Sequence, residues 1–263
     1  MAHPFRDPAP ARVALPNAPL VRVIVAARFP DVPSVVLDEF VGPFREALKG
    51  IYPICRRDES VGLMLGPQGA RALPASVDWR FVDELDHWRV TLGTTFVALD
   101  TPSYTSRDDL LARFAAVMDA VARCVAPARI DRLGVRYVDQ VRGEGLLARI
   151  GQLVRPEMLG LLGSELADDV TVGFTDHTLS AGEGRTVRAR SGALPAGSTI
   201  DPISIPPLGE RSWLLDVDAS QTAPLTLDNA AIVAEVGRLA ELAHRFFRWA
   251  VSEEFLRTFG GQP

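Results

Sequence analysis

Hydrophobic residues recur along this chain with two different periods, and the change of period marks out the expected secondary structure. Alternation of apolar and polar positions predicts strands at 20–29, 61–65, 79–84, 87–100, 130–141, 170–180, 185–191 and 211–218. Helical spacing predicts long helices at 106–125 and 228–251 and shorter ones at 34–48 and 146–154. Runs of strands followed by helices are typical of an α+β protein.

The two long helices carry continuous apolar stripes, so each is expected to bury one face. The first stripe consists of Leu110, Phe114, Val117, Met118, Val121 and Val125. The second consists of Ile232, Val236, Leu239, Ala243, Phe246 and Ala250. Ser106 with Asp109 three residues later is typical of a helix N-cap, whereas Pro43 predicts a kink or break in the helix at 34–48.

Two similar segments precede the long helices and indicate an internal duplication. Phe96-Val97-Ala98-Leu99-Asp100 stands before the first, and Ser212-Trp213-Leu214-Leu215-Asp216 before the last. The prediction is a pair of strand–helix–strands–helix halves that form one curved, mainly antiparallel sheet with the long helices on one face, a saddle-like fold. A helix-grip fold is the alternative. We expect a flexible N-terminal arm at 1–17, a first α+β half at 18–127 and a second at 128–263, packed as one compact unit.

Several short motifs spread over the chain resemble a known family. They are Asn17-Ala18-Pro19-Leu20-Val21, Arg28-Phe29-Pro30, Trp88-Arg89-Val90, the stretch 101–109 around Tyr104-Thr105-Ser106-Arg107, Arg132-Leu133-Gly134-Val135-Arg136-Tyr137 and Phe247-Arg248-Trp249-Ala250-Val251. Together they resemble a sporadically distributed, functionally uncharacterised bacterial family whose members are of about this chain's length. The resemblance implies a compact cytoplasmic protein and supplies no catalytic residues.

The amino-acid composition indicates the cellular compartment and the class of partner to expect. With 47% hydrophobic and 23% charged residues, the chain has the profile of an ordinary globular protein. Cys55 and Cys124, without a signal peptide, fit a reducing cytoplasm, and no apolar run is long enough to span a membrane. The net charge of −5 argues against a dedicated nucleic-acid binder.

Sequence motifs for catalysis, phosphate binding or metal binding are missing, so no cofactor, metal or catalytic residue is predicted. The four histidines are not spaced as metal ligands. Asp216 and Asp218 would share one side of a strand and could hold a cation. Because Asp100 occupies the equivalent position in the first half, a structural role at the strand-to-helix corner is the favoured interpretation for Asp216.

Arginines provide the candidate binding site. In four expected strands they lie opposite the apolar residues, which places them on the side of the sheet that helices leave exposed. Acidic residues are nearly absent from these positions, and a surface of one sign concentrates an anionic partner. The alternative is that any sheet with one wet face carries polar residues there. The predicted binding residues are Arg22, Arg28, Arg89, Arg132, Arg136, Arg188 and Arg190.

These observations leave three classes of function open. The favoured prediction is a non-catalytic binding or regulatory protein whose arginine-bearing face holds an acidic protein surface or other anionic ligand, in a bacterial accessory or defence-type system. The second is a nucleic-acid-binding saddle protein, although few aromatic residues fall on that face for stacking on bases. The third is a small-molecule enzyme with a pocket under the 194–209 loop.

Overall fold

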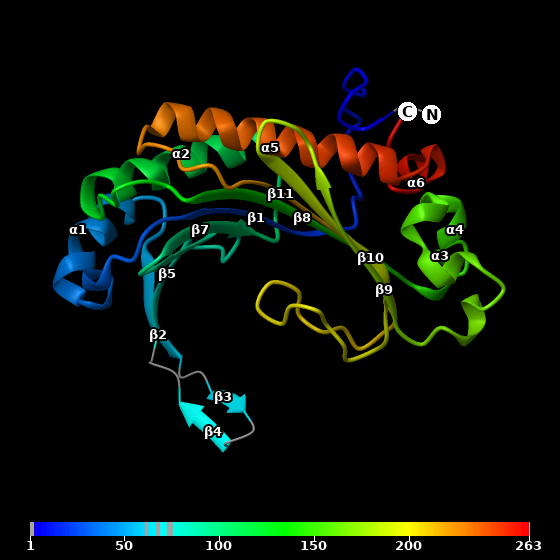
Figure 1. Ribbon diagram of the computed structural model, residues 1–263, viewed down its shortest axis with the longest axis horizontal. Helices are drawn as coiled ribbons and strands as arrows, with labels where there is room; N and C mark the ends of the chain where they lie inside the picture. Colours follow the sequence, from blue (N-terminus) through cyan, green and yellow to red (C-terminus); the bar gives the residue numbers. More distant parts are fainter. Residues whose placement is uncertain (1–2, 61–62, 67–68, 73–75, 263) are drawn as a thin grey trace. The chain divides into compact units, whose positions relative to one another are not determined.

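The computed structural model describes residues 3–60, 63–66, 69–72 and 76–262 (Figure 1). Side chains are described for these residues except within 60–76. The described part contains one nine-stranded sheet, in the order β2-β5-β6-β7-β1-β8-β11-β10-β9. Its members are β1 (Leu20–Arg28), β2 (Ile54–Ser60), β5 (Ser76–Val82), β6 (Arg89–Gly93), β7 (Phe96–Thr101), β8 (Arg132–Arg142), β9 (Gly173–Ser180), β10 (Arg185–Leu194) and β11 (Ser212–Gln221). The sheet is open and antiparallel, with helices packed on it, so the α+β class is confirmed.

Two long helices and several short ones complete the described elements. The helices are α1 (Asp38–Leu48), α2 (Arg107–Cys124), α3 (Glu144–Leu147), α4 (Ile150–Leu153), α5 (Asn229–Ala250) and α6 (Glu253–Thr258). Single 3-10 turns occur at η1 (Pro33–Val36), η2 (Pro156–Met158), η3 (Gly160–Gly163) and η4 (Ala167–Asp169). A separate hairpin joins β3 (Leu63–Gly66) to β4 (Gly69–Ala72). Of the strand expected at 61–65, residues 61–62 lie outside the described part.

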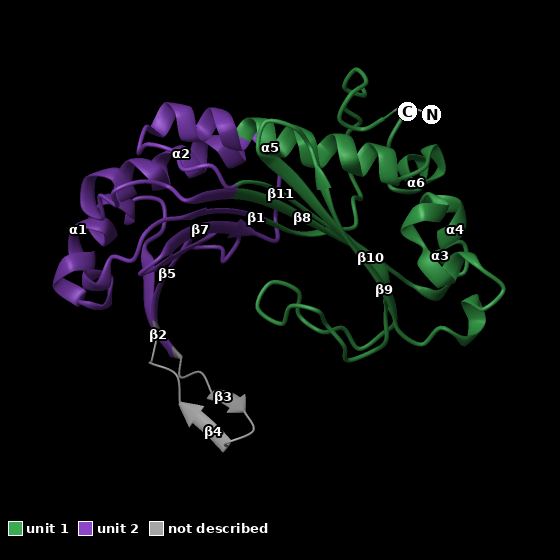
Figure 2. Cartoon of the chain, viewed as in Figure 1, with its two compact units in different colours: residues 1–23, 134–221, 237–263 green, residues 24–133, 222–236 purple. Residues whose placement is uncertain are grey.

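Contacts between residues divide the chain into two compact units, drawn in different colours in Figure 2. Unit 1 comprises residues 1–23, 134–221 and 237–263, and unit 2 comprises residues 24–133 and 222–236. Strands β1 and β8 and helix α5 each contribute residues to both units. The units are therefore discontinuous in sequence, and the expected division between 18–127 and 128–263 stays a prediction.

Unit 2 is built from the β2–β5–β6–β7 ladder and helices α1 and α2, which pack against each other. The Ser106 hydroxyl caps α2 by accepting from the Asp109 backbone N–H at 3.1 Å, as the sequence predicts. Every residue of the predicted α2 stripe is buried. The indole of Trp79 is also buried, and its Nε1–H donates to the Val35 carbonyl at 2.7 Å.

Unit 1 is built on the β9–β10–β11 ladder, with α3, α4, α6 and most of α5. The predicted hairpin between β9 and β10 is confirmed, and its turn has positive φ at Gly182, Glu183 and Gly184. All residues of the α5 stripe are buried. The N-terminal arm, expected to be flexible, contacts α5: the ring of Phe5 stacks on Phe246 with centroids 6.5 Å apart.

Three expected elements differ from those observed. The single strand expected at 87–100 is a hairpin, because β6 ends at Gly93 and β7 begins at Phe96 and pairs with it. The same alternation of apolar and polar residues continues through both strands, so the turn between them was not predicted. The helix expected at 146–154 consists of two single turns. Pro43 lies inside α1 without interrupting it, and the break falls earlier, at Leu37. Among the described helices, none has the length and apolar character needed to cross a membrane.

Candidate functional site

A buried carboxylate in the middle of β11, Asp216, is the centre of an ion-pair cluster in unit 1. Its Oδ1 accepts from Arg136 Nε at 2.8 Å, and its Oδ2 accepts from Arg136 Nη2 at 3.0 Å. Arg190, which lies opposite Asp216 in the β10–β11 ladder, also donates to Oδ2. The Asp216 side chain is 1% exposed, so two guanidinium groups supply the compensation that a buried charge requires.

Arg136 also fastens the proline-rich segment 195–210 to the sheet. Its Nη1 donates to Asp201 Oδ2 at 2.6 Å, and Arg22 Nε donates to the Ser204 carbonyl at 3.3 Å. The segment contributes Ile205 to a small apolar cluster with Val138, Leu194 and Leu214. Burial acts to lower the pKa of Arg136, but hydrogen bonds and charge from Asp216 and then Asp201 outweigh burial and raise it.

The remaining predicted arginines are distributed over both units. Arg188 pairs with Asp176 on β9 through two hydrogen bonds of 2.9 and 2.5 Å, and both side chains are about half exposed. That hydrogen bonding lowers the pKa of Asp176. In unit 2, Arg89 makes a two-bond pair of 2.8 and 2.9 Å with Asp100. Arg28 is exposed and Arg132 is half-buried.

Four of the seven predicted binding residues thus pair with carboxylates of the chain itself: Arg89, Arg136, Arg188 and Arg190. Their charges are therefore not the uncompensated positive surface that the strand alternation indicated. Asp216 was expected near the end of a strand at 211–218, at a strand-to-helix corner; β11 continues to Gln221, so Asp216 lies in the middle of the strand instead. Within the described ranges, no group of three or more His, Cys, Asp or Glu residues is placed to hold a metal ion.

Asp139 and Trp213 lie opposite each other on the other face of the same strands. The side-chain hydrogen bonds Arg136–Asp216 and Gln140–Ser212 indicate the register of β8 against β11. In this register Asp139, the residue before Gln140, lies opposite Trp213, the residue after Ser212. Side chains alternate along a strand, so both residues point away from Asp216. Asp139 is 5% exposed; burial, and then the negative charge of Asp216, raises its pKa to about 7.

A cavity of about 680 Å³ lies in unit 1 on the face of Trp213. Its walls come from α3, α4, the segment with η3 and η4, and the adjoining ends of β10 and β11. Ala193 and Trp213, which are partners in the β10–β11 ladder, form part of its base. The lining residues are Glu144, Leu147, Ala148, Ile150, Gly151, Leu162, Ala167, Asp168, Ala193, Glu210, Arg211, Ser212 and Trp213.

The indole of Trp213 carries an unsatisfied hydrogen-bond donor. The residue is 1% exposed, and its Nε1–H has no hydrogen-bond partner among the described residues. Trp79 in unit 2 is similarly buried, yet its Nε1–H is satisfied by Val35. A buried donor without a partner costs about 1–3 kcal/mol. Trp213 therefore contributes to the cavity wall, while its indole N–H is buried without an acceptor among the described residues.

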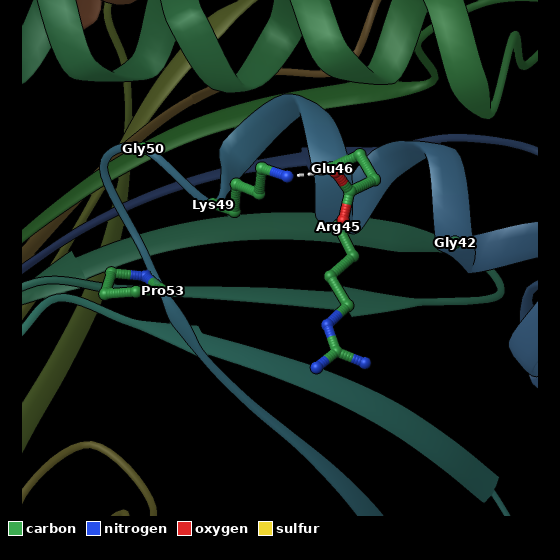
Figure 3. A pocket seen from close by; sticks show the side chains of 6 residues that line it. All are labelled: Gly42, Arg45, Glu46, Lys49, Gly50 and Pro53. Atoms are coloured by element: carbon green, nitrogen blue, oxygen red, sulfur yellow. Dashed lines mark hydrogen bonds and ion pairs between the residues drawn. The ribbon is translucent and has the colours of Figure 1, made fainter.

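A second cavity, of about 720 Å³, lies in unit 2 beside the C-terminal end of α1 (Figure 3). Arg45, Lys49 and Glu46 line it, and Lys49 forms an ion pair with Glu46. All three of these side chains are exposed. No residue in the lining of this second cavity is buried, whereas Ala193, Ser212 and Trp213 in the lining of the other are, so the cavity at Trp213 is the better candidate site.

Sequence reasoning did not find the cavity at Trp213. Neither of the two cavities is lined by residues 194–209, the loop under which a pocket was expected. One signal was present: Asp139 follows Leu133, Val135 and Tyr137 at alternate positions of β8 and places an acid on the apolar side. The chain gives no match to a family model or to a curated protein, so the bacterial family remains a predicted resemblance.

Proposed function

We propose that this protein is a non-catalytic binding protein that holds a small-molecule ligand in the cavity at Trp213. The observation that carries the proposal is the cavity itself, whose lining includes the buried Trp213, a residue whose indole N–H has no partner in the described chain. Ligand sites are concave, mostly apolar, and contain a few polar groups that fix orientation. At about 680 Å³, the cavity has the size of such a site.

Nuclear magnetic resonance of the ¹⁵N-labelled protein tests this proposal. The indole N–H signal of Trp213 is assigned by its loss in Trp213→Phe, and neutral, anionic and cationic aromatic fragments are titrated in turn. We expect some fragments to shift this signal saturably while the Trp79 indole signal stays in place. Ala148→Phe, which puts a ring on an exposed lining position, should weaken those fragments about 10-fold or more. Fragments that bind equally well to Ala148→Phe would contradict a site in this cavity.

An acidic partner is a second candidate, and the exposure of Arg28 and the half-exposure of Arg188 favour it. A partner that approaches Arg188 would compete with Asp176 for the same guanidinium group. Binding of poly-glutamate that weakens as salt rises, and that Arg28→Gln and Arg188→Gln each reduce, would support this function. Tighter binding of a DNA duplex than of poly-glutamate would favour the nucleic-acid alternative instead.

The duplicated, saddle-like architecture also belongs among the proposals. The strand order supports it, because β1 and β8 are neighbours, followed outward by β7 and β11, then β6 and β10, then β5 and β9. In each half the strand next to the central one leads along the chain to a long helix, α2 or α5. Superposition of the two halves in chain order, element by element, is the test of a common origin.

A further inference from the structure

The N-terminal arm is a peptide that the surface of unit 1 already binds. Its residues 3–12 lie on the C-terminal half of α5 (Figure 1). Arg245 donates to the Asp7 carbonyl, and Arg248 donates to the Ala11 carbonyl at 2.6 Å. The two arginines are three residues apart on the helix, so their side chains are neighbours on its surface. Helix α5 therefore holds the backbone of a peptide through two side-chain donors.

The other contacts of this stretch are few and shallow. The ring of Phe5 stacks on Phe246, and Arg12 forms an ion pair with Glu241 at 3.4 Å. None of residues 3–17 is buried. Exposed ion pairs contribute little to stability, and segments with few buried contacts open at a low cost in free energy. Residues 3–12 can therefore leave α5 while the rest of unit 1 stays folded.

The arm leaves the positive charges of Arg245 and Arg248 without a carboxylate. Each guanidinium group is bonded to a neutral carbonyl of the arm, and neither forms an ion pair with a described residue. Arg136, Arg188 and Arg190 differ in this respect, because each pairs with an aspartate. A hydrogen bond to a carboxylate is roughly twice as strong as one to a neutral acceptor. Carboxylates placed at these two arginines would therefore hold a peptide more tightly than the arm is held.

We propose that Arg245, Phe246 and Arg248 form a docking site for an acidic, extended segment of a partner protein, which displaces residues 3–12 from α5. Carboxylates of that segment pair with the two arginines. An aromatic side chain of the segment takes the place of Phe5.

Prolines suit such a segment. The arm contains Pro4, Pro8 and Pro10 in this stretch, and the hydrogen bonds from Arg245 and Arg248 use carbonyl oxygens, which proline retains. None of the residues that line the cavity at Trp213 is on α5. The docking site and the small-molecule function can therefore be tested separately.

Three synthetic peptides separate the effect of charge from recognition of the backbone. The first has the sequence of residues 3–12, the second carries Ala9→Glu and Ala11→Glu, and the third carries Ala9→Lys and Ala11→Lys. Each carries a fluorescent label, and its anisotropy is followed as the whole chain is added. The glutamate peptide should bind about 10-fold more tightly than the arm peptide, and the lysine peptide should bind most weakly.

Competition with the arm identifies where the peptides bind. The tethered arm acts at an effective concentration on the order of 1 mM, so a free peptide binds only as far as it displaces the arm. Phe5→Ala in the protein removes the ring stack that helps to hold the arm. This change should raise the affinity of the arm peptide and of the glutamate peptide about 3- to 10-fold. A peptide bound elsewhere would gain nothing from it.

Charge variants of α5 locate the preference for glutamate. Arg245→Gln and Arg248→Gln combined should abolish the preference for the glutamate peptide over the arm peptide. Arg245→Lys and Arg248→Lys combined keep the charge and should keep most of the preference. The matched control is Arg45→Gln with Arg123→Gln, two exposed arginines of unit 2 with the same total charge change, which should leave the preference as it is.

Each outcome decides for or against the docking site. A glutamate preference that is lost in the glutamine pair and kept in the lysine pair and the control, with tighter binding to Phe5→Ala, supports it. Equal binding of the three peptides, no binding up to their solubility limit, or no gain in Phe5→Ala would overturn it. A preference that survives in the glutamine pair would do the same. If a DNA duplex displaces the labelled glutamate peptide at lower concentration than the unlabelled peptide does, the surface belongs to nucleic acid instead.

Discussion

The two faces of β11 in unit 1 differ in how their buried polar groups are satisfied. On one face Asp216 is bonded to Arg136 and Arg190, and Arg136 is in turn bonded to Asp201. On the other face the Trp213 N–H has no partner in the described chain, and no cation is among the causes that shift the pKa of Asp139. The first face uses its polar groups to hold a loop in place, whereas the second leaves the Trp213 N–H without an acceptor.

The largest expected effect on stability comes from breaking the ion pairs of Arg136. Arg136→Gln leaves Asp216 buried with less compensation and releases Asp201, so the free energy of unfolding should fall by about 3–5 kcal/mol. The matched control is Arg188→Gln, which breaks an exposed pair and should cost less than about 1 kcal/mol. Urea denaturation measures both. Equal losses in the two variants would remove the distinction between a buried structural pair and an exposed one.

The pH dependence of the free energy of unfolding tests the other face, where Asp139 is buried. The pKa of Asp139 is raised from 3.8 to about 7 in the folded protein. Between these values the folded state retains a proton that the unfolded state has lost, so this group makes stability fall as pH rises from about 4 to 7. Asp139→Asn should remove that fall and stabilise the protein at pH 8 by roughly 2–4 kcal/mol.

Asp168→Asn, a change at an exposed carboxyl of the same unit, is the control for the titration and should leave the pH dependence of stability as it is. The quantity to measure is the free energy of unfolding from denaturant melts at intervals between pH 4 and pH 8. If Asp139→Asn destabilises the protein to the same extent at every pH in this range, Asp139 is already ionised in the fold and its burial does not have the assigned consequence.

The smallest expected effect compares two buried tryptophans. Trp79→Phe removes the hydrogen bond to Val35 and leaves a buried carbonyl without that donor, whereas Trp213→Phe removes a donor that has no partner. Both lose similar apolar contact, so Trp79→Phe should cost about 1–2 kcal/mol more than Trp213→Phe. Thermal or urea unfolding of the two variants gives the difference. A larger loss for Trp213→Phe would indicate that its N–H is satisfied in the folded protein.

The sequence predicted well the parts of the fold that follow from local periodicity. The stripes of α2 and α5 are buried as expected, because a long amphipathic helix repeats the same signal over several turns. The region 144–169 could not be resolved in the same way, since single turns and 3-10 segments are too short to establish a period. That region supplies most of the cavity wall, which is why the site was missed.

The arginine pattern shows where strand alternation stops being informative. Alternation predicts that Arg188 and Arg190 share a face of β10, and the ladder partners of these residues are consistent with that. It contains no information on which residues come to lie beside them. Asp176 is on the neighbouring strand and Asp201 is in a loop far along the chain from Arg136, so the compensating charges become apparent only in three dimensions.

The N-terminal arm is bound to α5 through its backbone as well as through the side chain of Phe5. Arg245 donates to the Asp7 carbonyl, and Arg248 donates to the Ala11 carbonyl at 2.6 Å. Every amino acid, proline included, keeps its carbonyl oxygen as an acceptor. Substitutions in the arm should therefore preserve these two anchors while they change its chemistry. The side chains at Asp7 and Ala11 can therefore change in evolution without loss of these anchors, whereas Arg245, Arg248 and Phe5 are constrained by the contacts they make.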